Sequence, residues 1–181
     1  MNRRELGALG LGGAAMLAGC NAGGPNAGPK DMGNFRLGFS VVVDDKLKKI
    51  PPSRNAPDGA LVARMKSALD ARFGVYSGSV DYVVAVALVG YSLAPPGIPI
   101  VLSPKSVLLA SANLWTETPQ EKLLGPEQIS AFEGGQAIIG TGFTRTADEQ
   151  MDVLATNMAR KIQDWLLRTP AARERFGLRN R

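Results

Sequence analysis

The sequence has no histidine and only one cysteine, Cys20, in 181 residues. A chain with this inventory cannot form an internal disulfide, hold zinc through a cysteine-rich ligand set or use an imidazole as a base. Neither a Gly-x-Ser-x-Gly nor a Ser-x-x-Lys motif is present to supply an activated serine. These absences exclude many familiar enzyme classes, and we expect no catalysis, no metal and no cofactor.

Long apolar runs and a broad surface charge are also lacking. After Cys20 no uninterrupted apolar run reaches the ~20 residues that span a bilayer, and the content of 45% hydrophobic and 20% charged residues is typical of a globular domain. The net charge is +5, yet residues 168–181 alone contain five arginines and one acidic residue. The basic character is therefore local. Because Phe176 is the single aromatic residue interleaved with these arginines, we expect no nucleic-acid partner.

The first twenty residues have the order of a secretion signal. Arg3 and Arg4 form a positive start, and a small-residue apolar stretch, residues 6–18, is too short to span a membrane. The stretch closes with the sequence Leu17-Ala18-Gly19-Cys20. These four residues resemble the lipobox of bacterial lipoproteins. The resemblance implies that Leu17, Ala18 and Gly19 are recognised by the signal peptidase, and that Cys20 is the lipidation site and the first mature residue.

Two alternatives concern this leader. An ordinary cleaved signal with a stray cysteine would give no lipid anchor. The Arg3-Arg4 pair also resembles a twin-arginine export signal, whereas the general export route needs no such pair. Asn21 follows the anchor where, in the enterobacterial sorting pattern, an aspartate favours inner-membrane retention. That resemblance implies the periplasmic face of the outer membrane. Several acyl chains would anchor firmly, since each buried methylene contributes about 0.8 kcal/mol.

Hydrophobic periodicity divides the rest of the chain. We expect a signal peptide at 1–19, a lipidated cysteine and flexible tether at 20–34, one domain at 35–168 and a basic C-terminal tail at 169–181. Strands are predicted over 35–43, 80–91, 105–116 and 136–143, with breaks at Gly125-Pro126 and Gly134-Gly135. One helix is predicted from Asp58, as its cap, to Gly74. A second begins with a capping box at Thr146 and Glu149 and stops before Pro170.

This order predicts an α+β fold with an antiparallel sheet of about four strands and two helices packed on one face, a two-layer sandwich. The layout behind a lipobox and tether resembles small periplasmic lipoproteins that assist envelope assembly, including the lipopolysaccharide-assembly lipoprotein and auxiliary lipoproteins of transporters. The resemblance implies a non-enzymatic accessory or binding component of envelope assembly or transport, with an envelope protein or lipid as partner. The alternative is an envelope enzyme that uses carboxylates alone, although Asp44-Asp45 is better explained as a solvated strand end.

Two surfaces are candidates for partner contact. We expect the helices to leave one apolar face of the sheet uncovered. The irregular segments 93–104 and 120–135 would cover this face, which is formed by Tyr82, Val84, Val86 and Leu88 with Val107, Leu109 and Trp115. A movable cover would bring five apolar side chains to a partner or an acyl chain: Leu93, Ile98, Ile100, Val101 and Leu102. The alternative is a fixed flap that completes the core.

The C-terminal arginines form the second candidate surface. Arg173, Arg175, Arg179 and Arg181 are candidates for contact with an anionic surface, the alternative being a solvated chain end. On either interpretation, truncation after Pro170 is expected to leave folding intact.

The lipobox interpretation makes the first testable prediction. Cys20→Ser should leave an unprocessed or soluble species, because the thiol is the only attachment point for the diacylglycerol. Detergent-phase partitioning and gel mobility measure this. A variant that still partitions fully into detergent with wild-type mobility would contradict the lipidation of Cys20.

Overall fold

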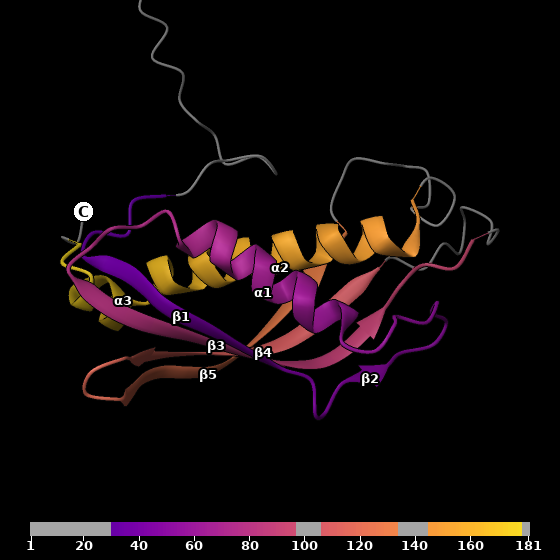
Figure 1. Cartoon of the computed structure of the whole chain (residues 1–181), viewed down its shortest axis with the longest axis horizontal. Helices are drawn as coiled ribbons and strands as arrows, with labels where there is room; N and C mark the ends of the chain where they lie inside the picture. Colours follow the sequence, from indigo (N-terminus) through magenta and orange to yellow (C-terminus); the bar gives the residue numbers. More distant parts are fainter. Residues whose placement is uncertain (1–29, 97–105, 134–144, 179–181) are drawn as a thin grey trace, which may run out of the picture.

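The computed structural model describes residues 30–96, 106–133 and 145–178. These residues form a five-stranded sheet and three helices. The elements are β1 (Phe35–Val43), β2 (Lys48–Lys49), α1 (Ala60–Phe73), β3 (Val80–Ser92), β4 (Val107–Thr116), β5 (Glu121–Phe132), α2 (Ala147–Arg168) and α3 (Pro170–Arg175). Both long helices lie on one side of the sheet (Figure 1). The predicted α+β class, with two helices on one face of the sheet, is confirmed.

The long strands follow the order β1-β3-β4-β5, and the short β2 pairs with β3. The β3–β4 pair is antiparallel, as predicted, and β4–β5, which includes a strand that the sequence did not predict, is antiparallel as well. The β1–β3 pair is parallel, which corrects the expectation of a wholly antiparallel sheet. The reason is α1, which carries the chain back along the sheet between these two strands, so that β3 runs in the same direction as β1.

The hydrophobic core lies between the helices and the sheet. α1 contributes Leu61, Met65, Leu69 and Phe73, all buried and spaced as one helical face. α2 contributes a longer buried face, at the spacing predicted from the sequence. The sheet contributes alternate residues of its two central strands: Tyr82, Val84, Val86 and Leu88 of β3, and Leu108, Ala110, Ala112 and Leu114 of β4.

The two long helices begin in different ways. The capping box predicted for α2 is present, with Thr146 Oγ1 accepting a hydrogen bond from Glu149 N at 3.2 Å and Thr146 N donating to Glu149 Oε2 at 2.7 Å. The prediction that Asp58 caps α1 is wrong. Gly59 is the cap residue, with a left-handed φ of 70°, and no side chain caps that end. A residue without Cβ adopts this φ at little cost, so the turn itself begins the helix.

β5 passes through Gly125-Pro126, where the sequence predicted a break. The strand tolerates these residues because it is an edge strand with irregular register, and Gly125 has a φ of 96° that favours glycine. Two α2 side chains cover part of this edge: Asn157 Nδ2 donates to the carbonyl of Phe132, and Lys161 Nζ to that of Ser130. The strand predicted at 136–143 lies outside the described residues.

The two ends of the described chain meet at one end of the sheet. Met32, Ala172 and Phe176 are each 0% exposed. The Phe176 ring packs edge-on against Phe35 and Tyr82, with ring centroids 5.4 and 5.2 Å apart. The folded body therefore extends beyond both predicted boundaries, which placed a tether through residue 34 and a tail from residue 169. At the C-terminal end the predicted boundary was wrong because Phe176, the one aromatic residue among the terminal arginines, is buried.

This packing also reverses the expected effect of C-terminal truncation. Phe176→Ala should destabilise the fold by about 3–5 kcal/mol, the cost of emptying a buried aromatic site, and truncation after Pro170 should cost at least as much. Arg175→Ala is the matched control, because the Arg175 side chain is exposed and should change stability by less than about 0.5 kcal/mol. Chemical denaturation of the three variants measures this, and equal stabilities for Phe176→Ala and wild type would contradict the packing.

Candidate functional site

The structure describes only part of the predicted contact and lipidation sites. Leu17, Ala18, Gly19 and Cys20 lie outside the described residues, as do Ile98, Ile100, Val101 and Leu102. Leu93 is described and is 0% exposed. Its backbone N donates to Ser53 Oγ at 2.9 Å, and its carbonyl accepts from Arg54 N at 2.9 Å. Leu93 is thus a fixed core residue at the end of β3.

The side of the sheet that faces away from α1 and α2, here called the open face, is composed differently from the prediction. The strand register pairs Val84 with Leu114 and Val83 with Trp115. Tyr82, Val84, Val86 and Leu88 belong to the core that contains the buried residues of α1 and α2, so they point toward the helices, and the open face carries the alternate set that begins with Val83. Both sets of β3 are apolar, so the sequence pattern alone could not assign them to faces. Of the predicted face residues, Val107, Leu109 and Trp115 do lie on the open face, where each is partly exposed.

Large hydrophobic side chains are exposed on the open face. In β1, Phe39, Val41 and Val43 are 42%, 38% and 41% exposed. Their register partners in β3 are Val83, Ala85 and Ala87, so this apolar surface runs across neighbouring strands. Phe132, which pairs with Val107, is 47% exposed on the same side. Exposed apolar side chains on β1, next to apolar positions of β3, make this part of the open face a candidate interaction site.

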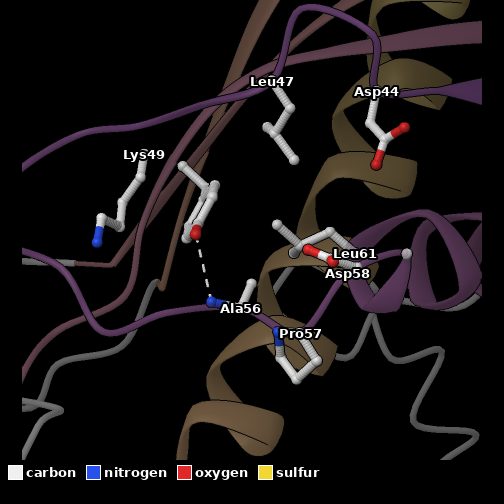
Figure 2. A pocket seen from close by; sticks show the side chains of 9 residues that line it. Asp44, Leu47, Lys49, Ala56, Pro57, Asp58 and Leu61 are labelled. Atoms are coloured by element: carbon white, nitrogen blue, oxygen red, sulfur yellow. Dashed lines mark hydrogen bonds between the residues drawn. The ribbon is translucent and has the colours of Figure 1, made fainter.

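A pocket of about 290 Å³ lies at the end of the sheet where β1 finishes. It is bordered by Asp44 after β1, Lys49 of β2, Asp58 before α1, and the buried Tyr91 (Figure 2). Tyr91 Oη accepts a hydrogen bond from Ala56 N at 3.2 Å, and Lys49 Nζ donates to Asn55 Oδ1 at 2.7 Å. The pocket therefore combines two carboxylates with a phenol and an ammonium group. Sequence reasoning noted Asp44 but did not place Asp58 beside the same pocket.

Two of the predicted anionic-surface residues, Arg173 and Arg175, lie on α3. Arg175 is exposed, and Arg173 is partly buried, with Nη1 3.4 Å from the carbonyl of Leu167. The other two, Arg179 and Arg181, lie outside the described residues. α3 sits beside the start of the described chain, because Asn34 N donates to the carbonyl of Phe176 at 2.9 Å. We call residues 30–35 together with residues 170–178 the joined end.

Tyr76, in the turn after α1, links the first described residue, Lys30, to α2. Its hydroxyl donates to the carbonyl of Lys30 at 2.6 Å and accepts from Nε2 of the buried Gln163. Lys30 Nζ forms an ion pair with Asp164 of α2 at 2.8 Å. Burial raises the pKa of Tyr76 to about 12, although the nearby Arg72 opposes this shift. The phenol therefore stays neutral and able to donate at any physiological pH.

The described residues contain neither a candidate metal site nor a helix that could span a membrane. Within the described ranges, no group of three or more cysteine, aspartate or glutamate side chains is placed to hold a metal ion. No helix among these residues is long and apolar enough to cross a bilayer.

Comparisons with known proteins give structural likenesses but no match to the sequence. No protein-family model matches it, and no curated protein matches its sequence. Its structure is similar to that of a DUF330-family protein from Xanthomonas campestris, with 11% identity, a TM-score of 0.42 and coverage of 77% of this chain and 90% of that one. It is also similar to a minor lipoprotein from Acinetobacter baumannii, with 14% identity, a TM-score of 0.32 and coverage of 74% and 94%. At these TM-scores the likenesses assign neither a family nor a function.

The contacts of Tyr76 generate a stability prediction. Tyr76→Phe leaves the buried amide of Gln163 and the carbonyl of Lys30 without this partner, so it should cost about 1–3 kcal/mol of unfolding free energy. Tyr82→Phe is the matched control, because Tyr82 Oη donates to the carbonyl of Arg175 at 3.2 Å, and the loss of this one hydrogen bond should cost about 0.5–1.5 kcal/mol.

The raised pKa of Tyr76 adds a pH readout. Because the folded state favours the neutral phenol, its contribution to stability is complete below the ordinary pKa of about 10 and is lost as pH rises through about 12. Absorbance titration should show a tyrosine with a midpoint near 12 in the wild type that is missing from Tyr76→Phe. A Tyr76→Phe variant no less stable than Tyr82→Phe, with an unchanged titration, would contradict this role.

Proposed function

We propose that the chain is a lipid-anchored periplasmic protein that acts as a non-enzymatic accessory or binding component in envelope assembly or transport. The observation that carries this proposal is the sequence Leu17-Ala18-Gly19-Cys20 at the end of a short apolar leader. The position of the folded domain supports this proposal. The described residues begin at Lys30, and the short segment between Cys20 and Lys30 is rich in glycine and proline, as expected of a tether. Asn21 favours the periplasmic face of the outer membrane as the site of attachment.

The open face supports a role in binding. Phe39, Val41 and Val43 expose apolar surface on a strand at the edge of the sheet, where side chains are accessible both from the face and from the edge. Burying such side chains against a partner releases about 25 cal/mol for each Å² of apolar surface removed from water. The partner is an envelope protein or a lipid, and it contacts the open face.

The pocket in Figure 2 favours a second candidate, an envelope enzyme that uses carboxylates alone. Asp44 and Asp58 border one cavity, and paired carboxylates can share acid and base roles. This alternative places the substrate in the pocket, whereas the binding proposal places the partner on the open face. The location of the contact therefore distinguishes them.

Substitution of Val41 tests the binding proposal. Val41→Lys should abolish capture of the envelope partner from cells crosslinked before detergent extraction, because it puts a charge in the centre of the apolar surface. Val75→Lys is the matched control, since Val75 is 59% exposed in the turn after α1 and away from the open face. Both variants should keep the wild-type melting temperature.

A photo-crosslinking side chain at Val41 or at Asp58 then locates the contact. We expect adducts from position 41, protein bands or lipid mass shifts according to the partner, and none from position 58. Adducts from position 58 alone, or equal capture by Val41→Lys and Val75→Lys, would contradict the proposal.

A further inference from the structure

We propose that the partner in the envelope is a protein that adds one extended strand to the free edge of β1. The free edge is the side of residues 39–43 that faces away from β3. This inference rests on the proposed binding function and deepens it, because it makes the partner a polypeptide and gives the geometry of the contact. A strand added in this way forms main-chain hydrogen bonds to the sheet, and its alternate side chains contact the side chains beside it.

β1 begins at the joined end and has one strand beside it. Among the described residues its register partners lie in β3, apart from an isolated bridge between Arg36 and Ser77 near its start. From Phe39 to Val43 the register with β3 continues without a shift. The backbone N–H and C=O groups on the outer side of this regular stretch are therefore placed to pair with an incoming strand.

The other edge of the sheet, formed by β5, is protected against such pairing. Asn157 Nδ2 donates to the carbonyl of Phe132 at 2.9 Å, and Lys161 Nζ donates to the carbonyl of Ser130 at 2.7 Å, so α2 occupies two acceptors of this edge. β5 also contains a proline, and its register with β4 shifts twice. Residues 39–43 contain neither a charged residue nor a proline. Because proteins use such residues and irregularities to block edge pairing, this sheet is protected at one edge and open at the other.

The two sides of the free edge differ in polarity. On the open face it carries three apolar side chains that are between 38% and 42% exposed, Phe39, Val41 and Val43. On the helix side, Ser40 Oγ donates to Asp70 Oδ1 at 2.6 Å and accepts from Lys66 Nζ at 3.1 Å. The contact of Lys66 Nζ with the Ser40 carbonyl is longer, 3.4 Å, so it holds that acceptor less firmly than α2 holds those of β5. A complementary strand alternates apolar residues toward the open face with polar residues toward α1.

A lipid or a second copy of the chain fits this edge less well. An acyl chain has no hydrogen-bonding groups, so it would remove the outer backbone groups of β1 from water without pairing them. The three exposed side chains alone offer at most about 300 Å², whereas a stable interface buries about 800 Å² on each partner, so the occupant must also use the backbone. Two copies paired through β1 about a twofold axis near Ser40 would bring their Lys66 side chains close together.

The test maps the contact residue by residue in cells that make the full-length lipidated protein. A photo-crosslinking side chain replaces one residue at a time, at positions 39, 41 and 43 on the open face and at position 66 of α1 above the free edge. Mass spectrometry of digested adducts identifies the partner residue that each position captures. We expect positions 39, 41 and 43 to capture residues spaced by two in a single segment of the partner, and position 66 to capture an intervening residue of the same segment.

A matched substitution separates the two edges of the sheet. Phe39→Gln and Phe132→Gln remove the same ring from positions that are 42% and 47% exposed, one on each edge strand. Capture of the partner should fall at least about tenfold in Phe39→Gln, the effect of losing one buried aromatic ring, and less than about twofold in Phe132→Gln. Both variants should keep the wild-type melting temperature, because neither ring belongs to the hydrophobic core.

Several results would overturn the inference and still leave a binding role for the open face. Captured residues spaced by three or four would indicate a helix, lipid mass shifts would indicate an acyl chain, and captured residues of β1 itself would indicate a second copy. Capture from positions 39, 41 and 43 without position 66, or an equal loss in the two glutamine variants, would place the partner on the open face alone. The proposed function fails in a different way, because none of the four positions would then capture an envelope component.

Discussion

The packing of Phe176 against Phe35 and Tyr82 is the contact on which the arrangement of the molecule depends. Phe35 begins the first strand and Phe176 follows the last helix, so one aromatic cluster joins the two ends of the folded chain. Aromatic pairs in edge-on geometry stabilise a fold beyond the area that they bury. Because this cluster fixes α3 beside residues 30–35, the described chain begins and ends at the same end of the sheet. The open face and the pocket are left on other parts of the surface.

Local patterns in the sequence predicted most of the elements but not their directions. The apolar spacing of α1 and α2, the capping box at Thr146 and the doubly apolar strands β3 and β4 all reflect interactions between near neighbours in sequence. The parallel pairing of β1 with β3 depends on where α1 returns the chain, which no local pattern records. β5 was misjudged at Gly125-Pro126 because an edge strand with a bulge accepts residues that a central strand excludes.

The candidate surfaces were predicted less completely. Both alternating sets of β3 are apolar, so only the packing against the helices shows that Val84 faces the core and Val83 the open face. Phe176 stood among arginines, and one apolar residue gives no periodicity from which burial can be inferred. The pocket between Asp44 and Asp58 joins positions on either side of an irregular loop, whose path the composition does not determine. By contrast, the residues that resemble a lipobox are contiguous, which is why sequence alone is enough to predict Cys20 as a candidate anchor.

Mass spectrometry of the mature amino terminus tests the central claim, lipid anchoring through Cys20, most directly. The protein purified from membranes should yield an amino-terminal peptide that begins at Cys20 and carries a diacylglycerol on sulfur and a further acyl chain on its amino group. A mature chain that begins at another residue, or one that retains a free Cys20 thiol, would contradict the account.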